Sequence, residues 1–212
     1  MLHPLLVSAA PGVVVRTMIT LEGSGAGLQG ENGAAATADG AGGGAAAGDG
    51  GAGQRRGVLT GLHLRHFYDT AVEVLGGHWV LERCVIESAR GEQRACAGVV
   101  VRGGARLELR DCVIKAASSA VLLSSAHCAL RLRGCHFANT RAAIVSERGG
   151  HVDVRGCTFS VSNAQDVGLR LHSDTTGAVV DNAGADWHSL WGPVVPPVGV
   201  EVDPVGVDQS ED

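Results

Sequence analysis

Four cysteines recur at nearly regular intervals, and cysteine can bind a metal, form a disulfide or pack in a core. Cys84, Cys112, Cys135 and Cys157 are separated by 28, 23 and 22 residues. Each follows an alternating run of apolar and charged residues, as in RLELRDCVI (Arg106–Ile114). Thiols repeated in this way would lie in a line, and a line of thiols cannot form a tetrahedron around one zinc ion. The spacing favours structural thiols in an apolar interior, with disulfide pairing as the alternative.

A stripe of arginines accompanies the cysteines. Arg110, Arg133 and Arg155 each stand two residues before a cysteine, and Arg131 lies beside them. Guanidinium groups in a row could bind carboxylates or phosphates through paired hydrogen bonds. The alternative is a solvated face whose charge is partly neutralised by acidic neighbours. We expect these four arginines to form the binding surface.

Two acidic residues, Glu108 and Asp153, could form a catalytic pair. If each cysteine phrase is one repeat, their carboxylates lie two repeats apart, near the upper end of the 6.5–9.5 Å range used by inverting glycosidases. Arg131 would stand between them and lower the pKa of both carboxylates, which removes the acid that such a mechanism requires. We therefore expect no enzyme activity, and we keep catalysis at this pair as the alternative.

The repeat itself predicts the architecture that positions these residues. Each unit reads as a strand, a glycine-containing turn, a second strand ending at the cysteine, a third short strand and a variable loop. The apolar residues alternate with a period of two, which excludes helical repeats. About 22 residues with three short strands is the size of one rung of a parallel β-helix. We expect an all-β, right-handed parallel β-helix of six to seven rungs.

Stacking of the rungs predicts which side chains face inward. Adjacent rungs lie about 4.8 Å apart, so equivalent residues form columns. Four interior columns are expected: Trp79, Leu107, Leu130 and Val152; Leu81, Leu109, Leu132 and Val154; the four cysteines; and Ile86, Ile114, Phe137 and Phe159. A rung beginning at LHLRHF (Leu62–Phe67) fits the same register, with Phe67 in place of the thiol and Arg65 in the arginine stripe.

Composition divides the chain of 212 residues into a β-helix over residues 1–181 and a C-terminal segment over 182–212. Residues 23–56 are low-complexity Gly and Ala, which predicts a disordered loop inserted in the β-helix. The C-terminal segment contains Trp187 and Trp191, then Pro, Val and acidic residues, so we expect a cap followed by an acidic tail.

The repeats resemble the right-handed β-helix of the pectin-lyase-like superfamily. Within it they are most similar to the β-helix regions of F-box proteins and of the Shc SH2-domain-binding protein, through phrases such as GVVVRGGARLELRDCVI (Gly98–Ile114). The resemblance covers residues 11–181 and implies the fold more than the function, because this fold hosts both enzymes and binding scaffolds. No segment resembles an F-box, so no ubiquitin-ligase role is expected.

These observations predict a non-catalytic scaffold that presents a rigid surface to a protein partner, as in a substrate-recognition module of a larger assembly. The alternative is a carbohydrate-active enzyme or a glycan-binding module. With a net charge of −5, no apolar run long enough to span a membrane and an N-terminus without a basic signal region, we expect no nucleic acid or membrane partner and an intracellular location, cytoplasmic or nuclear. The histidines are scattered in sequence, so neither a metal nor a cofactor is expected.

Overall fold

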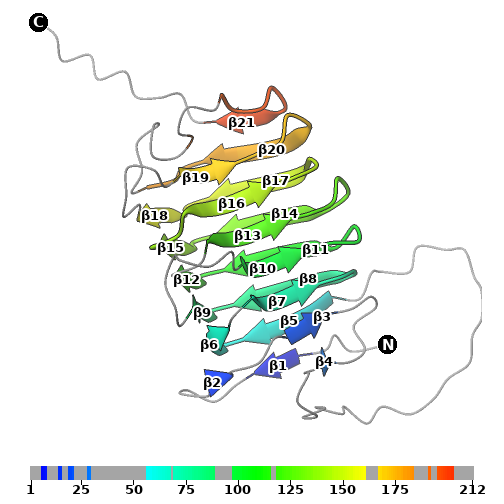
Figure 1. Ribbon diagram of the computed structural model, residues 1–212, viewed down its shortest axis with the longest axis vertical. Helices are drawn as coiled ribbons and strands as arrows, with labels where there is room; N and C mark the ends of the chain where they lie inside the picture. Colours follow the sequence, from blue (N-terminus) through cyan, green and yellow to red (C-terminus); the bar gives the residue numbers. More distant parts are fainter. Residues whose placement is uncertain are drawn as a thin grey trace, which may run out of the picture.

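The chain folds into a stack of β-strand rungs that climbs along one axis from the N-terminal to the C-terminal end (Figure 1). The computed structural model describes residues 6–8, 14–15, 19–21, 28–29, 56–67, 69–88, 97–115, 118–160, 167–183, 191 and 195–202. Every named element in these ranges is a strand, which confirms the all-β class. Within them, no helix is long and apolar enough to cross a membrane.

The strands form three sheets that run along the stack. Sheet A has eight strands: β1 (Leu6–Ser8), β5 (Arg56–Thr60), β8 (His78–Glu82), β11 (Arg106–Arg110), β14 (Ala129–Arg133), β17 (Gly150–Arg155), β20 (Thr175–Val180) and β21 (Val200–Val202). Sheet B has six: β2 (Val14–Val15), β6 (His63–Phe67), β9 (Val85–Ser88), β12 (Val113–Lys115), β15 (His136–Ala138) and β18 (Thr158–Ser160). Sheet C has seven: β3 (Ile19–Leu21), β4 (Leu28–Gln29), β7 (Thr70–Val74), β10 (Ala97–Val101), β13 (Ser119–Leu123), β16 (Ala142–Ser146) and β19 (Val167–Arg170).

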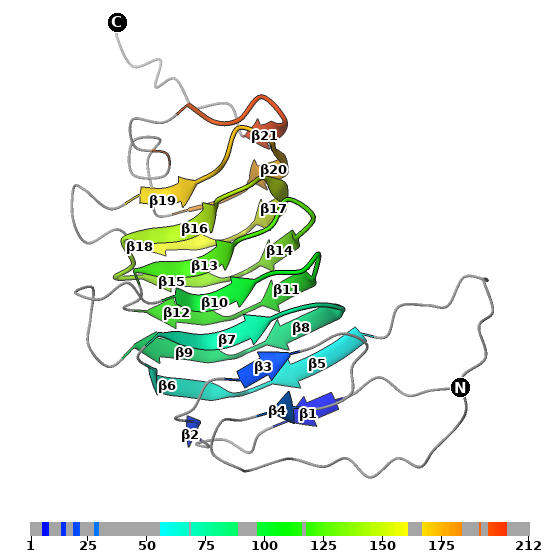
Figure 2. The same cartoon turned by 45° about the vertical axis from the view of Figure 1, so that its right-hand side comes forward.

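Each rung takes one strand from each sheet, in the order A, B, C. Six such sets follow one another, from β1–β2–β3 to β17–β18–β19, and β20 and β21 continue sheet A (Figure 2). All pairs between rungs are parallel, while β4 pairs antiparallel with β3 inside sheet C. The predicted parallel β-helix with three strands per rung is therefore confirmed.

The four predicted interior columns are present in register. Leu107 pairs with Trp79 and Leu130, and Ile114 pairs with Ile86 and Phe137. All sixteen residues of the four columns are at most 2% exposed. Burying one such large apolar side chain stabilises the fold by about 1.5–3 kcal/mol. The rings of Phe137 and Phe159 stack with their centroids 5.2 Å apart, so identical residues in successive rungs pack directly on each other.

The cysteines form a column of free, buried thiols, as predicted. Three of the four thiols can donate to a main-chain carbonyl of the preceding rung: the Sγ of Cys112 lies 3.3 Å from the oxygen of Leu81, that of Cys135 lies 3.4 Å from the oxygen of Leu109, and that of Cys84 lies 3.7 Å from the oxygen of Leu59. Asn182 continues the column, since its amide nitrogen donates to the carbonyl of Val154 at 3.2 Å. At Cys84, Cys112, Cys135 and Asn182 the column thus ties a rung to the one before it.

A second column at the same corner has a left-handed backbone. The residue before each thiol position has a positive φ angle: Gly61 (70°), Arg83 (52°), Asp111 (50°), Gly134 (61°), Gly156 (60°) and Asp181 (56°). This conformation turns the chain from sheet A into sheet B, and glycine and aspartate tolerate it better than most residues. The glycine-containing turn between sheets C and A also has positive φ angles, as at Gly104 and Gly149.

The rung at residues 56–67 differs from the predicted register. Leu64 pairs with Ile86 and Arg65 pairs with Glu87, so this segment belongs to sheet B, and Arg65 is not part of the arginine stripe. Leu62 takes the thiol position. Its main-chain carbonyl accepts a hydrogen bond from the amide of Val85, and the carbonyl of Cys84 accepts the equivalent bond from the amide of Val113 one rung later. The prediction for Phe67 was wrong, since alternation with a period of two is the same in sheets A and B.

The predicted division of the chain concerns mostly residues outside the described ranges. Within residues 23–56, β4 and Arg56 at the start of β5 are described. Within 182–212, β21 pairs with β20, and the buried Trp191 belongs to the core. Trp187 and Cys96 lie outside the described residues. The division at residues 181 and 182 stays a prediction.

We predict that Gly177→Ala will destabilise the fold strongly. Gly177 has a φ of 131°, and an added Cβ would overlap the carbonyl oxygen of Val152 in the preceding rung. We expect a loss of about 3 kcal/mol in the free energy of unfolding, measured by urea denaturation. Gly156→Ala is the matched control, because Gly156 also has a positive φ but the nearest atom lies 4.0 Å from a Cβ. Its cost should be near 1 kcal/mol, and equal losses would contradict the account.

We also predict that the thiol column is inert in the folded protein. In a Cys96→Ser background, a thiol reagent such as Ellman's reagent should label none of the buried cysteines until the protein unfolds. Hydrogen bonds with Cys135 and Cys84, together with burial, raise the pKa of Cys112, so raising the pH from 7 to 9 should not start its labelling. Rapid stoichiometric labelling under native conditions would contradict the interior position.

Candidate functional site

The outer face of sheet A gathers the charged residues that the sequence singled out. Three outward columns cross its strands in register. We name them the histidine column (Arg56, His78, Arg106, Ala129, His151 and Thr176), the carboxylate column (Val58, Val80, Glu108, Arg131 and Asp153) and the arginine column (Thr60, Glu82, Arg110, Arg133 and Arg155). The arginine stripe and the line of Glu108, Arg131 and Asp153 are thus in the predicted register, and Thr60 takes the place expected for Arg65.

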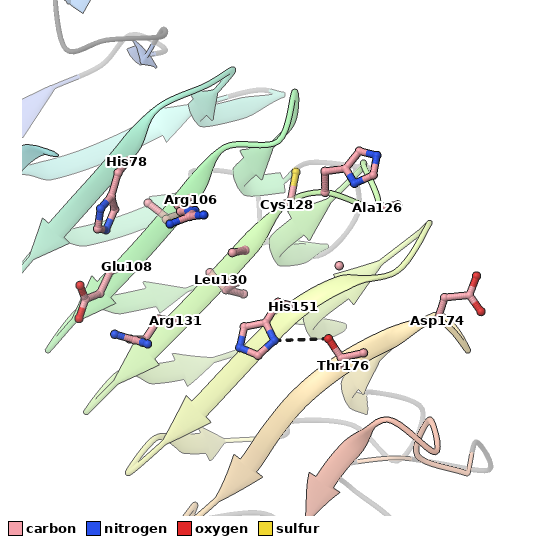
Figure 3. Close-up of a pocket in the computed structure, with 14 residues that line it drawn as sticks. His78, Arg106, Glu108, Ala126, Cys128, Leu130, Arg131, His151, Asp174 and Thr176 are labelled. Carbon is pink, nitrogen blue, oxygen red and sulfur yellow. Dashed lines mark hydrogen bonds between the residues drawn. The ribbon is translucent and has the colours of Figure 1, made fainter. Parts of the chain in front are cut away.

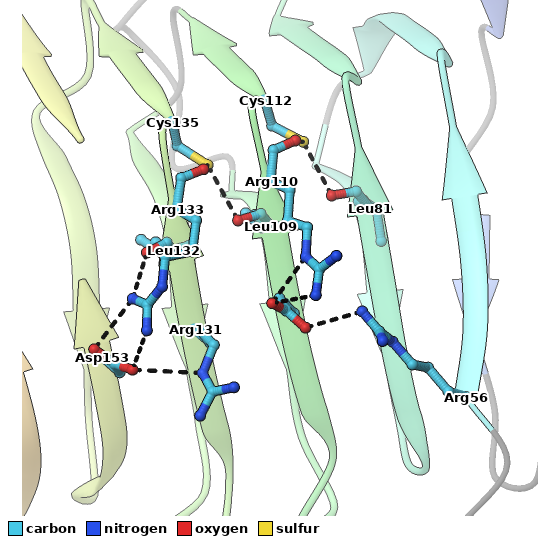
Figure 4. Close-up of polar contacts among 11 residues, drawn as sticks. Arg56, Leu81, Leu109, Arg110, Cys112, Arg131, Leu132, Arg133, Cys135 and Asp153 are labelled. Atoms are coloured by element: carbon cyan, nitrogen blue, oxygen red, sulfur yellow. Dashed lines mark hydrogen bonds and ion pairs between the residues drawn. The ribbon is translucent and has the colours of Figure 1, made fainter. Parts of the chain in front are cut away.

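Asp153 is the centre of one cluster on this face (Figure 4). Its carboxylate accepts two hydrogen bonds from Arg133, at 2.6 and 3.2 Å. It accepts a further one from the Nε of Arg155 at 3.0 Å. The Nε of Arg131 lies 3.4 Å away on the third side. Three guanidinium groups therefore surround one carboxylate, which is 8% exposed.

Glu108 is the centre of a second, smaller cluster. Its Oε1 accepts hydrogen bonds from the Nε and Nη2 of Arg110, the shorter of them 2.8 Å long. Its Oε2 accepts from the Nη2 of Arg56 at 3.1 Å. Glu108 is 7% exposed, so this carboxylate too is buried beneath the arginines that it binds.

The electrostatics of the Asp153 cluster hold the carboxylate in its charged form. Burial alone would raise the pKa of Asp153, but hydrogen bonds from Arg133 and Arg155 outweigh it, and the pKa lies below the usual value. The same hydrogen bond raises the pKa of Arg133. Asp153 is therefore ionised at neutral pH and acts as an acceptor that orients its arginines.

The face carries an excess of positive charge. From β5 to β17 the three columns present six arginines and three carboxylates (Arg56, Arg106, Arg110, Arg131, Arg133 and Arg155; Glu82, Glu108 and Asp153). The whole chain has a net charge of −5, so this basic surface contrasts with the rest of the molecule. A local field of this sign attracts anionic groups.

A hollow of about 650 Å³ opens at the edge of this face where the sheet A strands begin (Figure 3). His78, His127 and His151 line it together with Arg106 and Arg131. Three histidines that are scattered in the sequence thus line one hollow. His78 pairs with Arg106, and each stands six residues before a cysteine of the column. His127 comes from the loop between β13 and β14, which the strand pattern does not predict.

The described residues contain no group of three His, Cys, Asp or Glu side chains placed to bind one metal ion. The arrangement instead combines fixed guanidinium groups, imidazoles and two neutralised carboxylates. Groups of these types can bind anions through charge-assisted hydrogen bonds.

We predict that Asp153→Asn will lower the free energy of unfolding by about 2–3 kcal/mol at pH 7, because three arginines lose the negative charge and one of the two acceptor oxygens that they share. Since folding lowers the pKa of Asp153, its contribution is present above the unfolded pKa and is lost as pH falls through the folded value. Between pH 5 and pH 2, the free energy of unfolding measured by urea denaturation should therefore fall less steeply for Asp153→Asn than for the unmodified protein. Asp174→Asn is the control, because the Asp174 side chain is 77% exposed. If the free energy of unfolding of Asp153→Asn fell with pH as steeply as that of the unmodified protein, the prediction would be contradicted.

Comparison with known proteins agrees with the rungs and columns seen here. No curated protein and no solved structure matches the chain. One family, described as the right handed beta helix region, matches residues 39–183, which is more than half of the chain. The narrower likeness to pectin-lyase-like, F-box and Shc-binding proteins stays a prediction. The chain belongs to the right-handed β-helix family.

Proposed function

We propose that the protein is a non-catalytic scaffold whose sheet A face binds an acidic segment of a protein partner. The observation that carries the proposal is the column of Arg110, Arg133 and Arg155, held in place by buried carboxylates on a rigid sheet. Arginines fixed before binding lose little side-chain entropy when a ligand arrives.

The orientation of the guanidinium groups supports this role. Arg155 and Arg131 approach Asp153 through their Nε atoms, and their terminal amino groups make no hydrogen bond with another described residue. The side chains of Arg131 and Arg155 are 56% and 48% exposed. A carboxylate of a partner can therefore meet the planar end of each group, which suits paired hydrogen bonds.

A protein partner fits this face better than a glycan or a nucleic acid. Sugar rings and unpaired bases are usually bound by stacking on aromatic side chains, and the three described columns contain no Phe, Tyr or Trp. The acidic balance of the whole chain also differs from the strongly basic domains that bind nucleic acids.

The contacts of Glu108 and Asp153 support binding rather than catalysis at this pair. Both are buried under arginines, and the lowered pKa of Asp153 is the opposite of what a general acid requires. The alternative of a carbohydrate-active enzyme can be tested by a screen of polysaccharide hydrolase and lyase substrates. Turnover that disappears on mutation of Glu108 or Asp153 would overturn the proposal.

The binding proposal is tested with a fluorescein-labelled, glutamate-rich 12-residue peptide by fluorescence anisotropy. We expect the triple variant Arg110→Gln, Arg133→Gln, Arg155→Gln to bind the peptide about 10-fold or more weakly, since each exposed ion pair contributes up to about 1 kcal/mol. Binding should also weaken as salt rises.

The matched control removes three cations from elsewhere on the β-helix: Lys115→Gln, Arg141→Gln, Arg170→Gln. It has the same change in net charge and should leave the affinity within about 2-fold. Equal losses in both triple variants would show a general charge effect and contradict the proposal. Tighter binding of a single-stranded oligonucleotide or a sulfated oligosaccharide of equal charge would contradict the choice of a protein partner.

A further inference from the structure

The hollow beside the basic face exists because one small residue interrupts the histidine column. Ala129 stands in register between Arg106 and His151, so two rungs of larger side chains flank a gap (Figure 3). At about 4.8 Å per rung, Arg106 and His151 lie about 10 Å apart along the stack. Loop residues Ala126 and His127 border the gap on the side of sheet C.

The hollow holds positive charge that the protein does not neutralise. Arg106 is exposed and pairs with no carboxylate among the described residues. The nearest acidic side chain in its own rung, Glu108, already binds Arg56 and Arg110. Asp174 lies on the rim with its side chain 77% exposed and lies 3.7 Å from His172. An anion is the group that this site lacks.

The pKa of His78 reflects the positive charge around the hollow. Burial and the charge of Arg56, followed by those of Arg106 and Arg131, lower the pKa of His78, while Glu108 acts in the opposite direction. A bound anion would reverse this effect, because a negative charge favours the protonated imidazole. On the far side of the gap, His151 presents a second imidazole. Its Nδ1 lies 3.4 Å from the Oγ1 of Thr176 in the following rung.

The geometry points to a binding site for a phosphate monoester in this hollow, with Arg106, Arg131 and the imidazole of His151 as its donors. Guanidinium and imidazole donors converging from three rungs suit the three terminal oxygens of a phosphate better than the two of a carboxylate. The volume of about 650 Å³ admits the ester and the group attached to it. The inference rests on the proposed function, since the hollow adjoins the basic face and would accept a phosphorylated side chain of the acidic segment.

The experiment compares the glutamate-rich peptide with versions that carry one phosphoserine at each successive position. We expect at least one phosphorylated version to bind about 10-fold tighter than the plain peptide, an increment typical of charge-assisted hydrogen bonds. Arg106→Gln should remove most of that increment. Ala129→Leu should do so as well, because it fills the gap without changing the charge.

Arg141→Gln is the matched control, as it removes an exposed arginine away from the hollow, and it should keep the full increment. An increment that is absent at every position, or equal in the unmodified protein and Arg106→Gln, would overturn the inference. An equal increment from a sulfate ester would overturn the choice of phosphate.

A second measurement separates this inference from the proposed function. Phenyl phosphate is titrated into the full chain, and the histidine ring signals are followed by NMR, with His78→Gln and His151→Gln supplying the assignments. Shifts of both rings that Ala129→Leu abolishes would support the site even if no acidic peptide binds. Shifts with phenyl phosphate but no increment with any phosphopeptide would assign the site to small organic phosphates, whereas no shift of either ring would overturn it.

Discussion

The structure depends on one constraint, which is that each rung must hydrogen-bond to the next at the strand spacing of about 4.8 Å. This spacing places equivalent residues on top of one another, so every interior position must be filled by a column rather than by a single side chain. The stacked rings of Phe137 and Phe159 and the thiols that reach the carbonyls of the preceding rung are direct results. Interior columns therefore repeat one residue type or a close equivalent.

The same constraint creates a difficulty on the outer face, where like charges would also stack. Arg110, Arg133 and Arg155 occupy successive rungs, and their mutual repulsion is offset by carboxylates in the neighbouring column. Glu108 and Asp153 are buried because these arginines cover them. The residues that the sequence raised as a catalytic alternative are thus the groups that allow a cationic column to exist.

The sequence predicted the interior well, since alternation with a period of two and recurring cysteines together fix which side chains face inward. It failed at residues 62–67, because a short sheet B strand alternates in the same way as a sheet A strand, and the cysteine that would settle the register is replaced by Leu62. It also missed the hollow. Alternation shows which side chains face outward but not where they leave a gap, and this gap arises from a small residue, Ala129, which gives no signal of its own.

The three outer columns differ in how their charge is compensated, and this difference connects stability with binding. The arginine column receives its counter-charges from Glu108 and Asp153, which lie within the fold. The histidine column shares only the contact of Arg56 with Glu108, and Arg106 is left facing the hollow among the described residues. A fold can keep such an uncompensated cation at the surface because water solvates it at little cost. An anionic ligand in the hollow would then neutralise Arg106 and accept its hydrogen bonds, as Asp153 does for Arg133. The favourable interaction of Arg106 would contribute to ligand binding, whereas that of Arg133 contributes to folding.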